Sequence, residues 1–92
     1  MKVTVFFLGI MKEYTGQETV AFDFSGKATY GDLMRSIGQR FRGLLPDYIW
    51  DAKVNVFKDT VMAVGEERDL RSPDMPLVEN EEIKIMVVFA GG

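Results

Sequence analysis

The chain closes on Ile83-Lys84-Ile85-Met86-Val87-Val88-Phe89-Ala90-Gly91-Gly92, an apolar run followed by two glycines. Residues 83–89 predict a β-strand, because branched and aromatic side chains favour extended backbone. Gly91 and Gly92 have no side chain, so they can adopt almost any backbone angle and lie in a narrow channel. The ending predicts a sheet that presents a flexible tail, residues 89–92, with a reactive carboxylate. Glycines also accumulate at frayed ends without any function, which is the alternative.

Composition narrows the classes of function. Ninety-two residues with 47% hydrophobic side chains are enough for one domain, residues 1–92. The sequence has neither cysteine nor histidine, so we expect no disulfide, no metal site and no bound cofactor. The net charge of −3 gives no electrostatic reason to bind nucleic acid. The start has no signal-peptide pattern and no apolar run is long enough to span a membrane, which predicts a cytoplasmic protein.

The first part of the chain predicts two paired strands. The stretch 3–8 is apolar on both faces, as in a strand buried inside a sheet. Residues 12–16 form a polar connection that ends in a turn glycine. The stretch 20–25 then alternates between apolar and polar residues. Two strands separated by such a connection are expected to pair antiparallel.

A helix is predicted after these strands. Thr29 and Asp32 match a capping box, in which each side chain accepts a hydrogen bond from the other residue's backbone. From there, apolar residues recur at helical spacing: Leu33, Met34, Ile37 and Phe41. This pattern predicts one amphipathic helix of about three turns. Gly38 lies inside it at a cost of roughly 1 kcal/mol relative to alanine.

The second half is less regular. We expect a loop or a short helical turn packed on the core over 44–51, and a third strand over 53–57. Another strand over 61–64, a polar loop over 65–69 and a long turn segment over 70–82 should follow. One helix with four or five strands predicts an α+β fold, in which the helix covers one face of a mixed sheet. The first and last strands should be neighbours at its centre, because both are strongly apolar.

The order of these motifs resembles the ubiquitin-like β-grasp sulfur carriers of the MoaD/ThiS family, and in particular the small subunit of molybdopterin synthase. The resemblance covers nearly the whole chain and rests on residues 2–7, 12–16, 28–34 and 76–83 and on the ending Phe89-Ala90-Gly91-Gly92. The sequence departs from the family pattern in three places, of which one is a longer stretch over 51–64. Val87-Val88 replaces two prolines, and Asn80 replaces a glycine, a mild change because asparagine tolerates left-handed backbone.

The resemblance implies a chemistry. An E1-like adenylyltransferase would use ATP to adenylylate the carboxylate of Gly92, and a persulfide would convert the adenylate to a thiocarboxylate. In the large subunit of molybdopterin synthase, the tail would then donate its sulfur to a pterin precursor of the molybdenum cofactor. The chain alone would not be catalytic, because it would be a reactant on which other enzymes act.

The resemblance also assigns residues to partner contacts. Phe89, Ala90 and Gly91 would lie in the channel of a partner, although Phe89 could instead be the last core residue of its strand. An apolar docking patch on the sheet would contain Phe7, Leu70 and Met86, unless this protein's own loops bury both faces of the first strand. The acidic residues would steer docking or merely form a solvated surface: Glu66, Glu67, Asp69, Glu79, Glu81 and Glu82.

Three other functions use the same features. The chain could be a sulfur carrier for thiamin synthesis or for tRNA thiolation. It could be a ubiquitin-like modifier that forms isopeptide bonds through Gly92, because the activated intermediate is the same. It could also be an interaction domain whose terminus has no chemical role. The sequence does not separate these functions.

Overall fold

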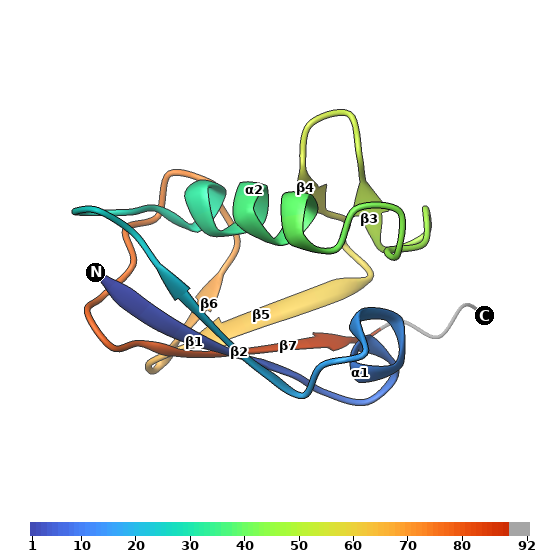
Figure 1. The fold of residues 1–92 in the computed structure, drawn as a ribbon, viewed down its shortest axis with the longest axis horizontal. Coiled ribbons are helices and arrows are strands. Elements are labelled where there is room, and N and C mark those ends of the chain that lie inside the picture. Colours follow the sequence, from blue (N-terminus) through green and yellow to red (C-terminus); the bar gives the residue numbers. More distant parts are fainter. Residues whose placement is uncertain (89–92) are drawn as a thin grey trace.

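The computed structural model describes residues 1–88. Two helices and seven strands form within this range (Figure 1). In chain order they are β1 (Lys2–Phe7), α1 (Ile10–Thr15), β2 (Thr19–Asp23), α2 (Tyr30–Arg40), β3 (Trp50–Asp51), β4 (Val56–Phe57), β5 (Val61–Gly65), β6 (Arg68–Leu70) and β7 (Glu82–Val87). No helix in this part of the chain is long and apolar enough to cross a membrane.

The main sheet has five strands in the order β2-β1-β7-β5-β6. The first and last strands lie side by side and parallel, with Thr4 opposite Glu82 and Phe7 opposite Ile85. β1 pairs antiparallel with β2, and β5 pairs antiparallel with both β7 and β6. The predicted mixed sheet, with the chain's two end strands as central neighbours, is confirmed.

Helix α2 begins as the sequence predicts. The Thr29 hydroxyl accepts a hydrogen bond from the Asp32 N–H at 3.2 Å, and the Asp32 carboxylate accepts one from the Thr29 N–H at 2.8 Å. The hydrogen bond from the Thr29 backbone lowers the pKa of Asp32. The buried face of the helix contains Leu33, Met34 and Ile37. The capping box fixes where the helix starts, and therefore which face meets the sheet.

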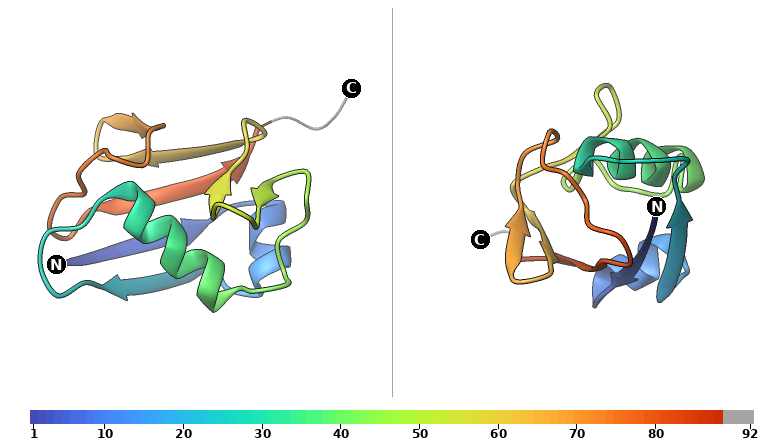
Figure 2. Two further views of the ribbon diagram at one scale, coloured as in Figure 1. Left: turned by 90° about the horizontal axis from the view of Figure 1, so that it is seen from above. Right: turned by 90° about the vertical axis from the view of Figure 1, so that its left-hand side faces the viewer.

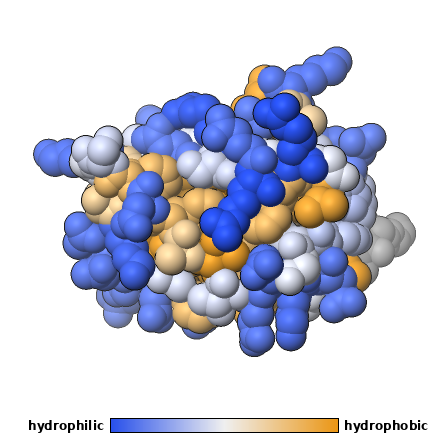
Figure 3. Space-filling view, viewed as in Figure 1, coloured by the Kyte–Doolittle hydropathy of each residue, from blue (hydrophilic) through white to orange (hydrophobic). Residues whose placement is uncertain are grey.

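The core lies between α2 and one face of the sheet. Alternate residues of the central strands point to this face, among them Val3, Val5, Phe7, Ile83 and Ile85, all buried. The Phe7 and Phe41 rings meet edge to face, 5.4 Å apart. Burial of each such side chain contributes about 1.5–3 kcal/mol. Apolar residues gather in a band between the helix layer and the sheet layer (Figure 3).

Gly38 allows α2 to approach the small two-stranded sheet of β3 and β4. A Cβ atom at this position would lie 2.6 Å from Asn55 Oδ1 and 2.8 Å from Trp50 Cζ2. Such contacts are shorter than real Cβ atoms make, so a larger residue would push the helix and the hairpin apart. The glycine offsets its low helix propensity by permitting this close contact.

Three predictions about local structure were wrong. The connection over 12–16 is mostly helix α1, which ends at Gly16 in left-handed conformation with φ 69°. The strand predicted over 53–57 is reduced to β4, and it pairs with β3 outside the main sheet. The loop predicted over 65–69 contains a tight turn and then β6, which pairs back onto β5. In the first and third cases a short element formed where polar residues had suggested a connection, and in the second a predicted strand was shortened to two residues.

Candidate functional site

Strand β7 leads to the predicted tail from the centre of the sheet. Its neighbours β1 and β5 both hydrogen-bond to it, and Ile83 and Ile85 fix it in the core. After the strand ends, the Val88 N–H still donates to the Thr60 carbonyl at 2.8 Å. The chain is therefore held firmly through residue 88. The predicted tail residues Phe89, Ala90, Gly91 and Gly92 lie outside the described residues.

A buried carboxylate fixes the start of β7. Glu81 has no exposed surface, and its two oxygens accept four hydrogen bonds. Arg68 donates to both of them, at 2.7 and 3.1 Å, and the Glu66 and Val78 N–H groups donate at 3.0 Å each. The network ties the β5–β6 hairpin to the turn that enters β7. Glu81 is therefore a structural residue, and its predicted role in a solvated or steering surface was wrong.

The electrostatics of Glu81 follow from this network. Burial acts to raise the pKa of the carboxyl group, but the hydrogen bonds from Arg68 and from the two backbone N–H groups outweigh it, so the pKa is lowered. Gly65 leaves room for the carboxylate, because a Cβ atom there would lie 2.1 Å from Glu81 Oε2. Asn80, the residue before Glu81, has φ 63°, which is left-handed backbone. Glycine adopts this conformation most easily, and asparagine, which stands in its place here, tolerates it.

Two of the predicted docking residues are in the core. Phe7 is 1% exposed and packs on Phe41, and Leu70 is 4% exposed. Both contradict the prediction that they lie on an accessible patch. Met86 is half-buried, and its docking role stays a prediction. The error on Phe7 is one of strand parity, because successive residues of a strand point to opposite faces.

The opposite face of the sheet carries an apolar surface. Ala63 and Ile85 pair across β5 and β7 in the core, so their neighbours Met62 and Met86, which also pair, point away from the helix. Phe6 and Val64 flank Lys84 on the same face. We call this set the outer-face patch: Phe6, Met62, Val64 and Met86, all of them half-buried. Sequence reasoning missed all but Met86.

The alternation of polar and apolar residues in β1 could have shown which of its two phenylalanines is buried. Lys2 and Thr4 are polar at even positions, while Val3 and Val5 are apolar at odd positions. This parity assigns Phe7 to the core and Phe6 to the outer face. Because β1 is half-exposed on that face, the prediction of a first strand buried on both faces was also wrong.

Among residues 1–88, no group of three or more acidic residues is placed to hold a metal ion. Tyr14 and Tyr48 join their hydroxyls beside α1, and this hydrogen bond raises the pKa of Tyr14. The described part of the site is thus a strand fixed in the sheet and an apolar face.

Searches with protein-family models and among curated proteins found no match to this sequence. Solved structures are similar in fold. The small archaeal modifier protein SAMP1 of Haloferax volcanii superimposes with a TM-score of 0.80, 16% identity and full coverage of both chains. A putative molybdopterin converting factor, subunit 1, from Pyrococcus furiosus gives 0.73 and 16%, over 97% of this chain and 99% of that one. Urm1 of Trypanosoma brucei gives 0.76 and 15%, over 99% and 96%.

These likenesses extend over essentially the whole chain at low sequence identity. They confirm the ubiquitin-like β-grasp fold, of the MoaD/ThiS type, that the sequence motifs predicted. At such identities a shared fold does not carry a shared reaction, because one fold serves many functions.

Proposed function

We propose that the chain is a ubiquitin-like sulfur carrier that acts as the small subunit of a molybdopterin synthase in the cytoplasm. The observation that carries the proposal is the placement of β7. This strand is locked between β1 and β5, and its sequence continues directly into Phe89-Ala90-Gly91-Gly92. A rigid body followed by two glycines is what an enzyme that activates a carboxyl terminus needs, and the fold is shared with a putative molybdopterin converting factor.

The proposed reaction begins at the carboxylate of Gly92. This carboxylate attacks the α-phosphorus of ATP in an E1-like adenylyltransferase, and pyrophosphate leaves. The persulfide of a donor protein attacks the acyl carbon, and AMP leaves. A thiol then reduces the acyl disulfide and releases the thiocarboxylate. The tail enters the large subunit of the synthase, where the sulfur attacks the pterin precursor and forms a thioester. Water then cleaves the acyl carbon–sulfur bond, which leaves the sulfur on the pterin and returns the Gly92 carboxylate.

Docking to these partners is assigned to the outer-face patch. Apolar surface that is exposed on a small protein is typical of interaction sites. Met62 and Met86 adapt their shape easily, which suits a surface that must meet two partners in turn. Met86 lies on β7, shortly before the tail in sequence, so docking there brings the tail to the partner's active site.

The test is intact-protein mass spectrometry after incubation with an E1-like enzyme, ATP and a persulfide donor. The expected gain is the mass difference between sulfur and oxygen. A variant with one residue added after Gly92 should fold and stay unmodified, and the same mass measurement on the untreated protein establishes that Gly92 is its last residue. If the chain stays unchanged while an authentic carrier is converted, the proposal is wrong.

A second candidate function is protein modification, because SAMP1, a modifier by name, has the same fold. Both functions pass through the acyl-adenylate of Gly92. In a sulfur carrier a persulfide attacks this adenylate, whereas in a modifier the chain is finally joined to the amine of a lysine. Lysine-linked adducts that disappear when Gly92 is deleted would identify a modifier. Conversion of a pyranopterin precursor by the thiocarboxylate and a synthase large subunit would identify the molybdopterin role, while reactivity only toward a thiazole synthase or a tRNA-thiolating enzyme would redirect the pathway.

A further inference from the structure

Strands β5 and β6, at one edge of the main sheet, border a pocket beside helix α2. Seen from above, α2 runs over the side of the sheet formed by β1 and β2, while β5 and β6 lie beside it (Figure 2). A pocket of about 420 Å³ occupies this side of the molecule, between α2, β4, β5 and β6. Its volume lies within the range of about 300–1,000 Å³ that is typical of small-molecule sites.

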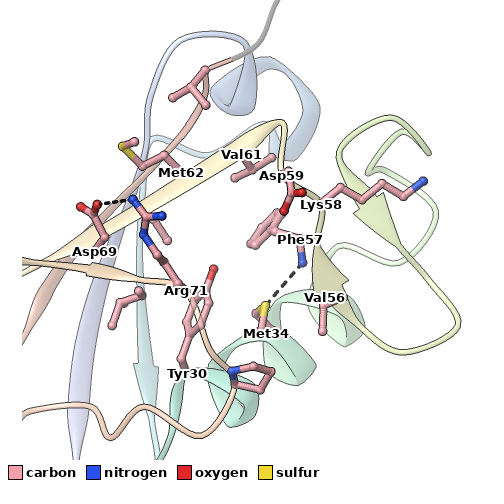
Figure 4. Close-up of a pocket in the computed structure, with 14 residues that line it drawn as sticks. Tyr30, Met34, Val56, Phe57, Lys58, Asp59, Val61, Met62, Asp69 and Arg71 are labelled. Carbon is pink, nitrogen blue, oxygen red and sulfur yellow. Dashed lines mark hydrogen bonds and ion pairs between the residues drawn. The ribbon is translucent and has the colours of Figure 1, made fainter.

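The lining of the pocket combines apolar side chains with the charged residues Lys58, Asp59, Asp69 and Arg71. It includes Met34 from α2, Phe57 from β4, Val61 and Ala63 from β5, and Leu70 from β6. The Phe57 N–H donates to the Met34 sulfur at 3.4 Å, which holds β4 against the helix (Figure 4). Four elements from distant parts of the sequence thus hold the walls in place, so the cavity does not depend on a single loop.

Tyr30 is the unusual residue of this lining. It is 4% exposed, and Figure 4 shows its hydroxyl pointing into the pocket. Among residues 1–88 the hydroxyl makes no hydrogen bond, and the only bond of this residue outside α2 is from its backbone to Met75. Every fully buried side-chain oxygen or nitrogen in residues 1–88 has a hydrogen-bond partner. Because the Tyr30 hydroxyl has none, it is not fully buried and must be accessible through the pocket. A buried phenol needs a partner, and none of residues 1–88 supplies one, so a bound ligand could do so.

Arg71 supplies a second donor on the same side of the pocket. One of its NH₂ groups donates to Asp69 at 3.0 Å. A guanidinium has five N–H donors, so this pair leaves others for a ligand. Lys58 and Asp59 also line the pocket, but Lys58 points away from it in Figure 4. Burial raises the pKa of Tyr30, which keeps its hydroxyl protonated as a donor at neutral pH.

We propose that this pocket binds a small apolar carboxylate, with its hydrocarbon body against Met34, Phe57 and Leu70 and its carboxylate accepting hydrogen bonds from Tyr30 and Arg71. Two donors that converge beside an apolar wall select a ligand with an acceptor at one end. The site shares Met62 with the outer-face patch, but none of the groups that would hold the ligand belongs to that patch. Binding therefore does not depend on the sulfur-carrier proposal.

Phenylacetate is a suitable probe, because it joins one ring to one carboxylate. We expect saturable changes in the amide NMR spectrum around Tyr30, Met34 and Leu70, with a dissociation constant on the order of millimolar for so small a ligand. Phenylacetamide, which has the same shape without the charge, should bind more weakly. Tyr30→Phe and Arg71→Gln should each weaken phenylacetate binding by about tenfold, as expected for hydrogen bonds to a charged group.

Two matched variants serve as controls. Tyr48→Phe removes a hydroxyl outside the pocket, and Arg42→Gln removes an exposed charge from the loop after α2, so both should bind phenylacetate like the unmodified protein. If Tyr30→Phe does not fold, Arg71→Gln still decides, because Arg71 is exposed. The inference is overturned if the shifts do not saturate, if they centre on the outer-face patch, or if Arg71→Gln binds as tightly as the control variants.

Discussion

Replacement of Glu81 tests whether the start of β7 is held as the structure indicates. Glu81→Ala removes the acceptor of two backbone N–H groups and leaves Arg68 without its partner. Loss of one partner of a buried ion pair costs about 3–5 kcal/mol. The Arg68 side chain is 25% exposed, so water can solvate the unpaired guanidinium and reduce this cost. We therefore expect a loss of about 3 kcal/mol in the free energy of unfolding, the lower end of that range.

The expected loss is large for a domain of this size. A change of about 3 kcal/mol corresponds to a fall of roughly 12–24 °C in melting temperature. Circular dichroism at neutral pH measures it, and Glu82→Ala is the matched control. Glu82 is the next residue and exposed, so its loss should change the free energy of unfolding by less than about 0.5 kcal/mol. If the two variants melt at similar temperatures, the Glu81 network does not stabilise β7.

The pH dependence of Glu81 gives a second measure of the same network. The folded-state pKa is lowered, so the stabilisation is complete above the unfolded value of 4.5 and is lost as the pH falls through the folded value. The difference in unfolding free energy between the unmodified protein and Glu81→Gln should therefore shrink in acid. Taking the difference removes the contribution of other carboxylates. A difference that stays constant from neutral pH to well below 4.5 would contradict the lowered pKa.

Three further outcomes are expected. Gly38→Ala should lower the free energy of unfolding by about 1–3 kcal/mol despite the better helix propensity, because the new methyl group meets Trp50, and urea denaturation measures it. Thr29→Ala should cost about 0.5–2 kcal/mol in the same assay, while an unchanged midpoint would mean that the bond to Asp32 adds nothing. Met86→Lys should melt like the unmodified protein but be adenylylated at least about tenfold more slowly, and normal kinetics would remove the outer-face patch from docking.

The parts of the fold that long patterns determine could be predicted from sequence. Helix α2 has both a capping box and an apolar stripe, and β1 and β7 are the most apolar stretches of the chain. Each signal extends over six residues or more, so the periodicity is visible. The adjacency of β1 and β7 followed from burial, because the strands with the most apolar surface gain most from the centre of the sheet.

The short elements could not be predicted in this way. Helix α1 has six residues, too few to establish a helical period, and only the flanking Gly9 and Gly16 with buried Met11 marked it. β6 has three residues, two of them charged, and forms because the turn before it brings Arg68 opposite Gly65. Glu67 adopts φ 56° in that turn, a conformation that no pattern of apolar residues indicates.

Of the candidate site, the sequence predicted the strand β7, while the predicted tail lies outside the described residues. It named one residue of the outer-face patch, Met86. Phe7 was predicted to lie on the exposed face of the sheet, but Phe7 is buried and Phe6 lies on that face. Two adjacent phenylalanines cannot be told apart until the alternation of the strand assigns each to one face. The pocket beside Tyr30 had no sequence signal, since its walls come from four separate elements.

The geometry of β7 explains why one strand can serve both docking and presentation of a tail. Its odd-numbered residues Ile83 and Ile85 anchor it in the core, and the even-numbered Met86 lies on the outer face. The strand has hydrogen-bonded neighbours on both edges, so it cannot shift in register without breaking two ladders at once. A partner that binds the outer-face patch therefore meets Met86 at a fixed distance along the chain from residue 89. Under the proposed function, recognition of the body then sets where Gly92 arrives, which is the kind of positioning that makes a reaction between two macromolecules efficient.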